Sequence, residues 1–141
     1  MSVLTVIVHL IQKGKKIMFS INLRSRTAIY EQIIEQIEDG ILKGILNPNE
    51  QLPSVRGLSM ELTLNPNTVS KAYSDLEKRG LIYSLVGKGS FIAPEAKEII
   101  RKKYNADFND FKETLIKYRA SGVEKDSLIE IINSIYSLEE N

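Results

Sequence analysis

The sequence contains no cysteine, no tryptophan and only one histidine, His9, among 141 residues. Without cysteine the chain has no disulfide, no thiolate ligand for zinc and no cysteine nucleophile. A single histidine also excludes metal sites built on histidine pairs, and it leaves the main body without the base of a Ser-His-Asp triad. No carboxylate pair is embedded in an apolar pattern that would raise its pKa. We therefore expect no enzyme, no metal site and no cofactor.

A long apolar run and a strong net charge are also missing. The apolar stretch near the start, residues 3–11, is too short to span a bilayer, which takes about 20 residues. Basic residues follow this stretch, whereas in a secretory signal they precede it. We therefore expect a cytoplasmic protein with no membrane partner. The net charge is only +1, so binding to nucleic acid would have to rest on a local surface.

The first seventeen residues stand apart from the rest. Met18 precedes a pattern that would begin normally without them, and residues 12–16 could be encoded by a purine-rich run resembling a bacterial ribosome-binding site. We interpret residues 1–17 as a mis-assigned or alternative start, and we give His9 no functional role. The alternative is an added edge strand that carries Val3, Thr5, Ile7 and His9.

Periodicity and capping signals predict three helices and a hairpin over residues 18–93. Apolar residues recur at helical spacing over 27–42, and Ser54 is a suitable N-cap for a short helix over 55–62. Asn65 followed by Pro66 predicts the start of a third helix that ends near Arg79. Strands over 81–85 and 90–93 flank a glycine turn. This order is typical of a winged helix-turn-helix.

Two further helices are predicted over residues 94–141, separated by a break at 120–123. Their apolar stripes are too wide for the two helices to bury alone. The predicted fold class is therefore mostly α with a small β-hairpin: an N-terminal winged helix-turn-helix followed by a short two-helix C-terminal tail.

The third helix carries short polar side chains on the face opposite its apolar side. Such side chains suit base edges and phosphates in a major groove, and the helix N-terminus adds backbone donors. They are Asn67, Thr68, Ser70, Lys71 and Ser74. The hairpin tip, Gly87–Ser90, brings Lys88 and flexible backbone close to a second surface. Taken singly, each signal also fits a solvated helix face or an ordinary turn, and their order along the chain favours DNA binding.

Four motifs in this order resemble the GntR family of bacterial transcription regulators. They are Gln51–Arg56 (QLPSVR), Leu64–Tyr73 (LNPNTVSKAY), Leu76–Ile82 (LEKRGLI) and Gly87–Phe91 (GKGSF). The NPNTV segment and the short C-terminal region are similar to the YtrA subfamily. The resemblance implies a homodimeric repressor of double-stranded operator DNA with an inverted repeat, controlling a transporter operon.

The resemblance also implies roles for particular residues. We assign DNA binding to residues of the second helix, the recognition helix and the wing tip, namely Ser54, Arg56, Asn65, Asn67, Thr68, Ser70, Lys71, Gly87, Lys88 and Gly89. We assign dimerisation to apolar residues of the tail, which must be buried somewhere. They are Phe108, Phe111, Leu115, Leu128, Ile131, Ile132 and Ile135.

The sequence departs from the family in its charge. Some relatives carry arginine where this chain has Pro66 and Ser70, and a basic residue often precedes the wing glycine where this chain has Val86. Residues 24–93 hold eight basic and eight acidic side chains. Specific binding would then require acidic residues to lie on the side away from DNA, and we expect this of Glu31, Glu35 and Glu38.

Two questions stay open at this level. The chain is too short for the metabolite-binding domain of larger relatives, and it lacks the aminotransferase domain that binds pyridoxal phosphate. A small apolar pocket between tail and winged helix could still bind a small-molecule effector. The alternative function is a winged helix for protein–protein contact without specific DNA binding, in which the outer face of the third helix would be apolar or acidic.

Overall fold

The computed structural model describes residues 5–12 and 15–138 of the chain. Its elements follow in the order β1 (Thr5–Gln12), β2 (Lys15–Asn22), α1 (Ile29–Leu42), α2 (Val55–Leu62), α3 (Pro66–Lys78), β3 (Ile82–Leu85), β4 (Gly89–Ile92), α4 (Ala96–Ala120) and α5 (Lys125–Ser137). The chain divides into two units, residues 1–102 and 103–141. No helix in the described ranges is long and apolar enough to cross a membrane.

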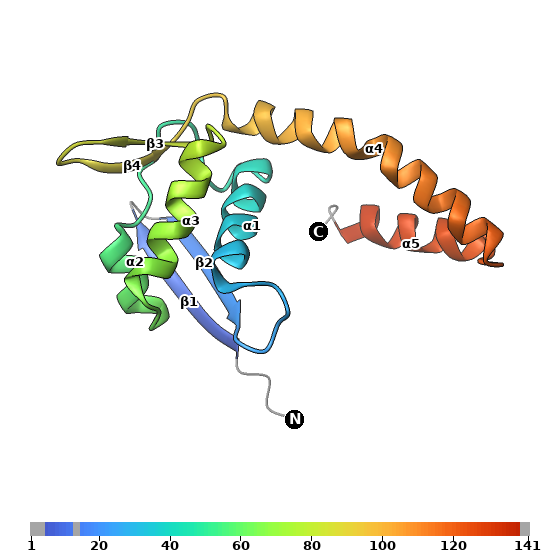
Figure 1. Ribbon diagram of the computed structural model, residues 1–141, viewed down its shortest axis with the longest axis horizontal. Coiled ribbons are helices and arrows are strands. Elements are labelled where there is room, and N and C mark those ends of the chain that lie inside the picture. The colour runs from blue at the N-terminus through green and yellow to red at the C-terminus, as the bar shows by residue number, and fades with distance from the viewer. Residues whose placement is uncertain (1–4, 13–14, 139–141) are drawn as a thin grey trace. The chain divides into compact units, whose positions relative to one another are not determined.

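The first unit contains helices α1–α3, the β1–β2 pair, the β3–β4 hairpin and the first turns of α4, and α1 and α2 both pack on α3 (Figure 1). The apolar periodicity of each helix puts one face in a shared core, in which Ile33, Ile37, Leu58 and Leu76 are fully buried. Strands β3 and β4 pair antiparallel, with Ile82 opposite Ile92 and Leu85 opposite Gly89. The predicted fold class, a winged helix-turn-helix followed by two helices, is confirmed.

The sequence analysis did not predict strand β2. It pairs antiparallel with β1, and its last residues dock on α1 through two glutamine side chains. The amide of Gln32 donates to the carbonyl of Asn22 and accepts from its backbone N–H, and Gln36 does the same with Ser20. Phe19 is buried beside them. Strand β1 agrees with the edge-strand alternative for residues 1–17, although Val3 lies outside the described residues.

The first unit extends past Ala93, where we expected the winged helix to end. Ala96 and Ile100, on the first turns of α4, are buried in the same core as the three helices. The start of α4 therefore belongs to the first unit by packing. A domain boundary drawn from the proline at position 94 misses this, because Pro94 marks where the hairpin stops but not where the core stops.

The second unit consists of the part of α4 after residue 102 and the whole of α5. Between the two helices Gly122 adopts a φ of +89°, which favours glycine, and the N–H of Val123 donates to the carbonyl of Tyr118. The predicted break at residues 120–123 is thus confirmed as a helix C-terminal turn. Phe108 and Phe111 contact each other at 5.9 Å between ring centres, and both remain exposed.

Candidate nucleic-acid interface

The N-terminus of α2 is capped by Ser54, as predicted. Its Oγ accepts a hydrogen bond from the backbone N–H of Gly57 at 2.9 Å. A side chain at position 57 would place its Cβ 2.9 Å from that same Oγ, so the cap and the glycine fit each other. Arg56 is exposed in the first turn of the helix. The hydroxyl of Ser54 therefore already serves as an acceptor, whereas the guanidinium of Arg56 faces solvent.

A tight turn joins α2 to α3. Thr63 has a φ of +54°, a left-handed conformation, and the N–H of Leu64 donates to the carbonyl of Ser59 at 2.8 Å. Asn65 then caps α3, its Oδ1 accepting from the N–H of Asn67 at 2.8 Å, and Pro66 occupies the first helical position. The structure thus gives the Asn65 side chain a capping contact, and the DNA-binding role assigned to it stays a prediction.

The faces of α3 are divided as the sequence predicted. Val69, Ala72, Tyr73 and Leu76 are buried against the core. Of the residues assigned to DNA, Asn67, Ser70 and Lys71 are exposed, together with Ser74, whereas Thr68 is half-buried. The exposed set offers hydrogen-bond donors, acceptors and one cation on a single helix face, which is the chemistry that reads base edges and phosphates.

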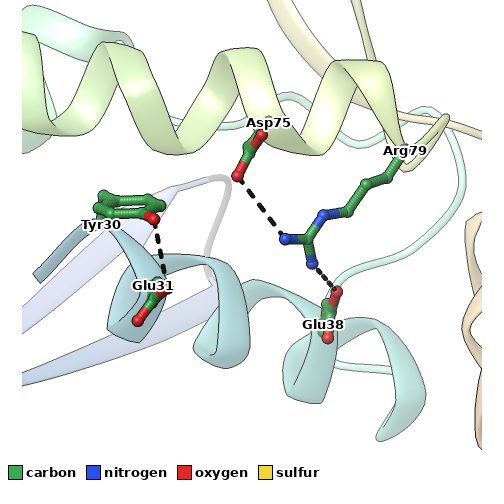
Figure 2. A network of polar contacts seen from close by, with 5 residues as sticks. All are labelled: Tyr30, Glu31, Glu38, Asp75 and Arg79. Atoms are coloured by element: carbon green, nitrogen blue, oxygen red, sulfur yellow. Dashed lines mark hydrogen bonds and ion pairs between the residues drawn. The ribbon is translucent and has the colours of Figure 1, made fainter. Parts of the chain in front are cut away.

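The ammonium of Lys71 is held by a residue that the sequence analysis did not single out. Its Nζ lies 3.8 Å from the centre of the Tyr30 ring on α1, a cation–π geometry. The hydroxyl of Tyr30 in turn donates to Glu31 at 3.2 Å (Figure 2). Glu31 is exposed and is linked to Lys71 only through Tyr30, and the expectation that Glu31 lies on the side away from DNA stays a prediction. No local pattern marks Tyr30, because its partner lies 41 residues further along the chain.

A second bridge between α1 and α3 lies near the other end of these helices. Arg79 donates from Nη1 to Oε1 of Glu38 at 3.1 Å, and its Nη2 lies 3.6 Å from Asp75 (Figure 2). Glu38 is 5% exposed. Glu38 therefore contributes no exposed negative charge, because burial against α3 requires its carboxylate to be paired with a cation; the expectation that it lies on the side away from DNA stays a prediction.

The wing tip is built from backbone conformations that favour glycine. Gly87 and Gly89 have φ values of +74° and +107°, and the N–H of Lys88 donates to the carbonyl of Leu85. All three assigned wing residues are exposed, and so is Val86 beside them. The tip therefore presents one cation and one apolar side chain on an exposed glycine turn.

Tyr73 connects the recognition helix to the segment before α2. Its hydroxyl donates to the carbonyl of Pro53 at 2.7 Å. Burial raises the pKa of this phenol well above its ordinary value, because the interior disfavours the charged phenolate. The position of α2 relative to α3 is thus secured by a neutral hydrogen bond next to the cap at Ser54.

Comparisons with known proteins agree with this geometry. The family model described as "Bacterial regulatory proteins, gntR family" matches residues 29–92. The chain is 44% identical over 119 residues to the "HTH-type transcriptional repressor YtrA" of Bacillus subtilis (strain 168), covering 84% of this chain and 92% of that protein.

Two solved structures from Listeria monocytogenes are similar as well. One, a "Transcriptional Antiterminator" from strain EGD-e, has a TM-score of 0.66 at 34% identity and covers 84% of this chain and 90% of its own. The other, a "GntR family transcriptional regulator", has a TM-score of 0.64 at 28% identity, over 79% of this chain and 98% of its own. Both matches therefore cover more of the chain than the winged helix alone.

Proposed function

The chain belongs to the gntR family of bacterial regulatory proteins and is a DNA-binding transcription regulator rather than an enzyme. From this premise we propose that it represses transcription as a homodimer on an inverted-repeat operator. The observation that carries the proposal is the outer face of α3. It exposes Asn67, Ser70 and Lys71. In this arrangement Asn67 and Ser70 read base edges, Lys71 and Arg56 bind phosphates, and the wing approaches the neighbouring groove.

Dimerisation is assigned to the tail. Five of its seven predicted residues are exposed, and Leu115 and Leu128 are half-buried. Phe108 is 65% exposed and Ile131 56%. Apolar side chains gathered at helical spacing on one pair of helices favour contact with a second copy of the same surface. Two recognition helices held in this way would enter successive major grooves about 34–36 Å apart and block polymerase.

The domain and partner assignments follow from the same proposal. We assign residues 18–93, with the first turns of α4 added, to DNA binding and the remainder of the C-terminal tail, up to residue 141, to dimerisation. Repression would take place in the cytoplasm, and the regulated genes would be a transporter operon that includes the regulator's own gene. The alternative start at Met18 is tested by the intact mass of the natively expressed protein, and a mass beginning at Met1 would contradict it.

A small-molecule effector has a candidate cavity in the first unit. The cavity has a volume of about 120 Å³ and lies where the end of α1 and the loop at Leu46 meet the end of β4 and the start of α4. Its walls are largely apolar, and Lys97 is among the lining residues. We propose this cavity as the effector site, and small anions are its first probes because Lys97 is cationic. A thermal-shift series of short-chain carboxylates tests this, and equal shifts in wild type and Lys97→Ala would contradict the assignment.

The function is tested by fluorescence anisotropy against the DNA upstream of the regulator's own gene and against a scrambled duplex, each titrated with salt. We expect Kd values of about 10⁻⁸ to 10⁻¹¹ M for the first duplex only, with a steep salt dependence. If both duplexes bind equally weakly, the next experiment selects the genomic fragments that the protein binds. If no fragment is enriched, the alternative of a protein–protein module replaces the proposal.

A further inference from the structure

Gln51 joins two parts of the candidate interface that lie far apart in the sequence. Its Nε2 donates a hydrogen bond of 2.8 Å to the carbonyl oxygen of Lys88 at the wing tip. Its backbone forms an antiparallel bridge with Phe91. On either side, the N–H of Leu52 donates to Ser90 and the carbonyl of Glu50 accepts from Ile92. Residues 50–52 thus run antiparallel along β4, joined to it by an isolated bridge and its flanking hydrogen bonds.

The contact at the wing tip is closely fitted. A Cβ added to Gly89 would lie 3.0 Å from Nε2 of Gln51, and Gly89 adopts a φ of +107°. A side chain at position 89 would therefore crowd the glutamine amide and displace it by a few tenths of an ångström. An amide of this length reaches the Lys88 carbonyl because Gly89 has no side chain in its path.

The same segment leads directly to the recognition elements. Three residues after Gln51, Ser54 caps α2, and Arg56 lies exposed in the first turn. Pro53 lies between Gln51 and Ser54, and its carbonyl accepts a hydrogen bond from the hydroxyl of Tyr73 on α3. A displacement of the wing tip relative to residues 51–54 would therefore change the spacing between Lys88, on the wing, and Arg56, on α2.

We propose that Gln51 is a positioning residue for DNA recognition: its side-chain amide holds the wing tip at a set distance from the N-terminus of α2, so that Lys88 and Arg56 bind one duplex together. This inference rests on the proposed function. It assigns Gln51 no contact with DNA. The Gln51 amide restricts the glycine-rich tip before DNA is bound. The tip then loses less conformational entropy on binding.

The test uses Gln51→Met, which keeps the length of the side chain and removes the donor. We expect affinity for the operator to fall about fivefold to tenfold, the effect of one lost hydrogen bond, with thermal unfolding almost unchanged. In a double-mutant cycle, Lys88→Ala weakens binding in the wild type and has little further effect in the Gln51→Met protein. Gln36→Met is the matched control, since it removes a glutamine amide that pairs with Ser20 instead.

A second measurement needs no DNA. Backbone order parameters of residues 87–89 fall in the Gln51→Met protein, whereas they are unchanged in Gln36→Met. Additive effects of Gln51→Met and Lys88→Ala, or unchanged order parameters at the tip, would overturn the inference. A wild-type protein that binds no operator, together with a tip that loosens in Gln51→Met, would instead locate the failure in the proposed function.

Discussion

The ammonium of Lys71 in the middle of α3 lies 3.8 Å from the centre of the Tyr30 ring on α1. The negative face of the ring attracts the cation, and a flexible lysine is thereby given a preferred direction before any ligand is bound. Tyr30 is in turn oriented by its hydrogen bond to Glu31. The charge assigned to phosphate binding is thus positioned by a helix other than its own.

Lys71→Ala is expected to weaken binding to operator and scrambled DNA alike and to reduce the slope of log K against log salt by about one. Tyr30→Leu removes the ring and should lower affinity about twofold to fivefold, whereas Tyr30→Phe keeps the ring and should bind like the wild type. Anisotropy titrations at four salt concentrations measure both. Lys112→Ala removes the same charge from the tail, and an equal loss in that variant would contradict the assignment.

Asn67→Ala should relax specificity at one or two base pairs and weaken operator binding by about 1–3 kcal/mol, if the amide makes a bidentate base contact. The neighbouring Asn65→Ala instead removes the cap of α3, whose Oδ1 accepts from the N–H of Asn67. It should reduce the free energy of unfolding by about 1 kcal/mol without changing which base is preferred. Binding to a panel of single-base operator variants separates these outcomes, and identical preferences for wild type and Asn67→Ala would mean that this side chain reads no base.

Arg79→Ala should lower the free energy of unfolding by about 1–3 kcal/mol, because it leaves the carboxylate of Glu38 nearly buried without its cation. The Glu38 side chain is 7% exposed and that of Arg79 43%. Glu38→Gln keeps an acceptor for Arg79 and should be milder. Lys78→Ala, an exposed neighbour, should change stability by less than about 0.5 kcal/mol. Urea unfolding measures all three, and equal effects at positions 78 and 79 would show that the bridge does not stabilise the fold.

Tyr73→Phe removes the hydroxyl that donates to the carbonyl of Pro53 and should reduce stability by about 1 kcal/mol. Because burial raises the pKa of Tyr73 in the folded chain, the folded state keeps a proton that the unfolded state releases above about pH 10. This contribution is fully present below that pH and is lost as pH rises above it. Wild-type stability should therefore fall more steeply above pH 10 than that of Tyr73→Phe, and parallel curves would contradict the prediction.

A chain ending at Lys102 should unfold at a higher temperature than one ending at Ala93. The longer form keeps Ala96 and Ile100, both buried in the core of the first unit, and burying one isoleucine side chain contributes about 1.5–3 kcal/mol. Both forms should sediment as monomers and bind operator weakly, because the dimerisation residues are absent. A dimer formed by either would remove the tail from its assigned role.

Local signals account for the parts of the site that were predicted. Ser54 and Asn65 cap α2 and α3 through contacts two or three residues along the chain, and the buried face of α3 follows from its apolar spacing. The missed features involve partners at larger separations. Gln51 meets Lys88 37 residues away, and Arg79 meets Glu38 41 residues away. Periodicity detects residues that recur at helical or strand spacing, and a single pair of residues at these separations forms no such pattern.

The sequence by itself determined the order of helices and hairpin, the caps, and the polar outer face of α3, because each depends on interactions within one or two helical turns. Only the tertiary structure decided that Glu38 is paired and not solvated, that Tyr30 holds Lys71, and that residues 50–52 join the wing. Those relationships arise when distant elements pack and exclude water. Burial then requires each charge or amide to find a partner, and that partner is the nearest group in space rather than in sequence.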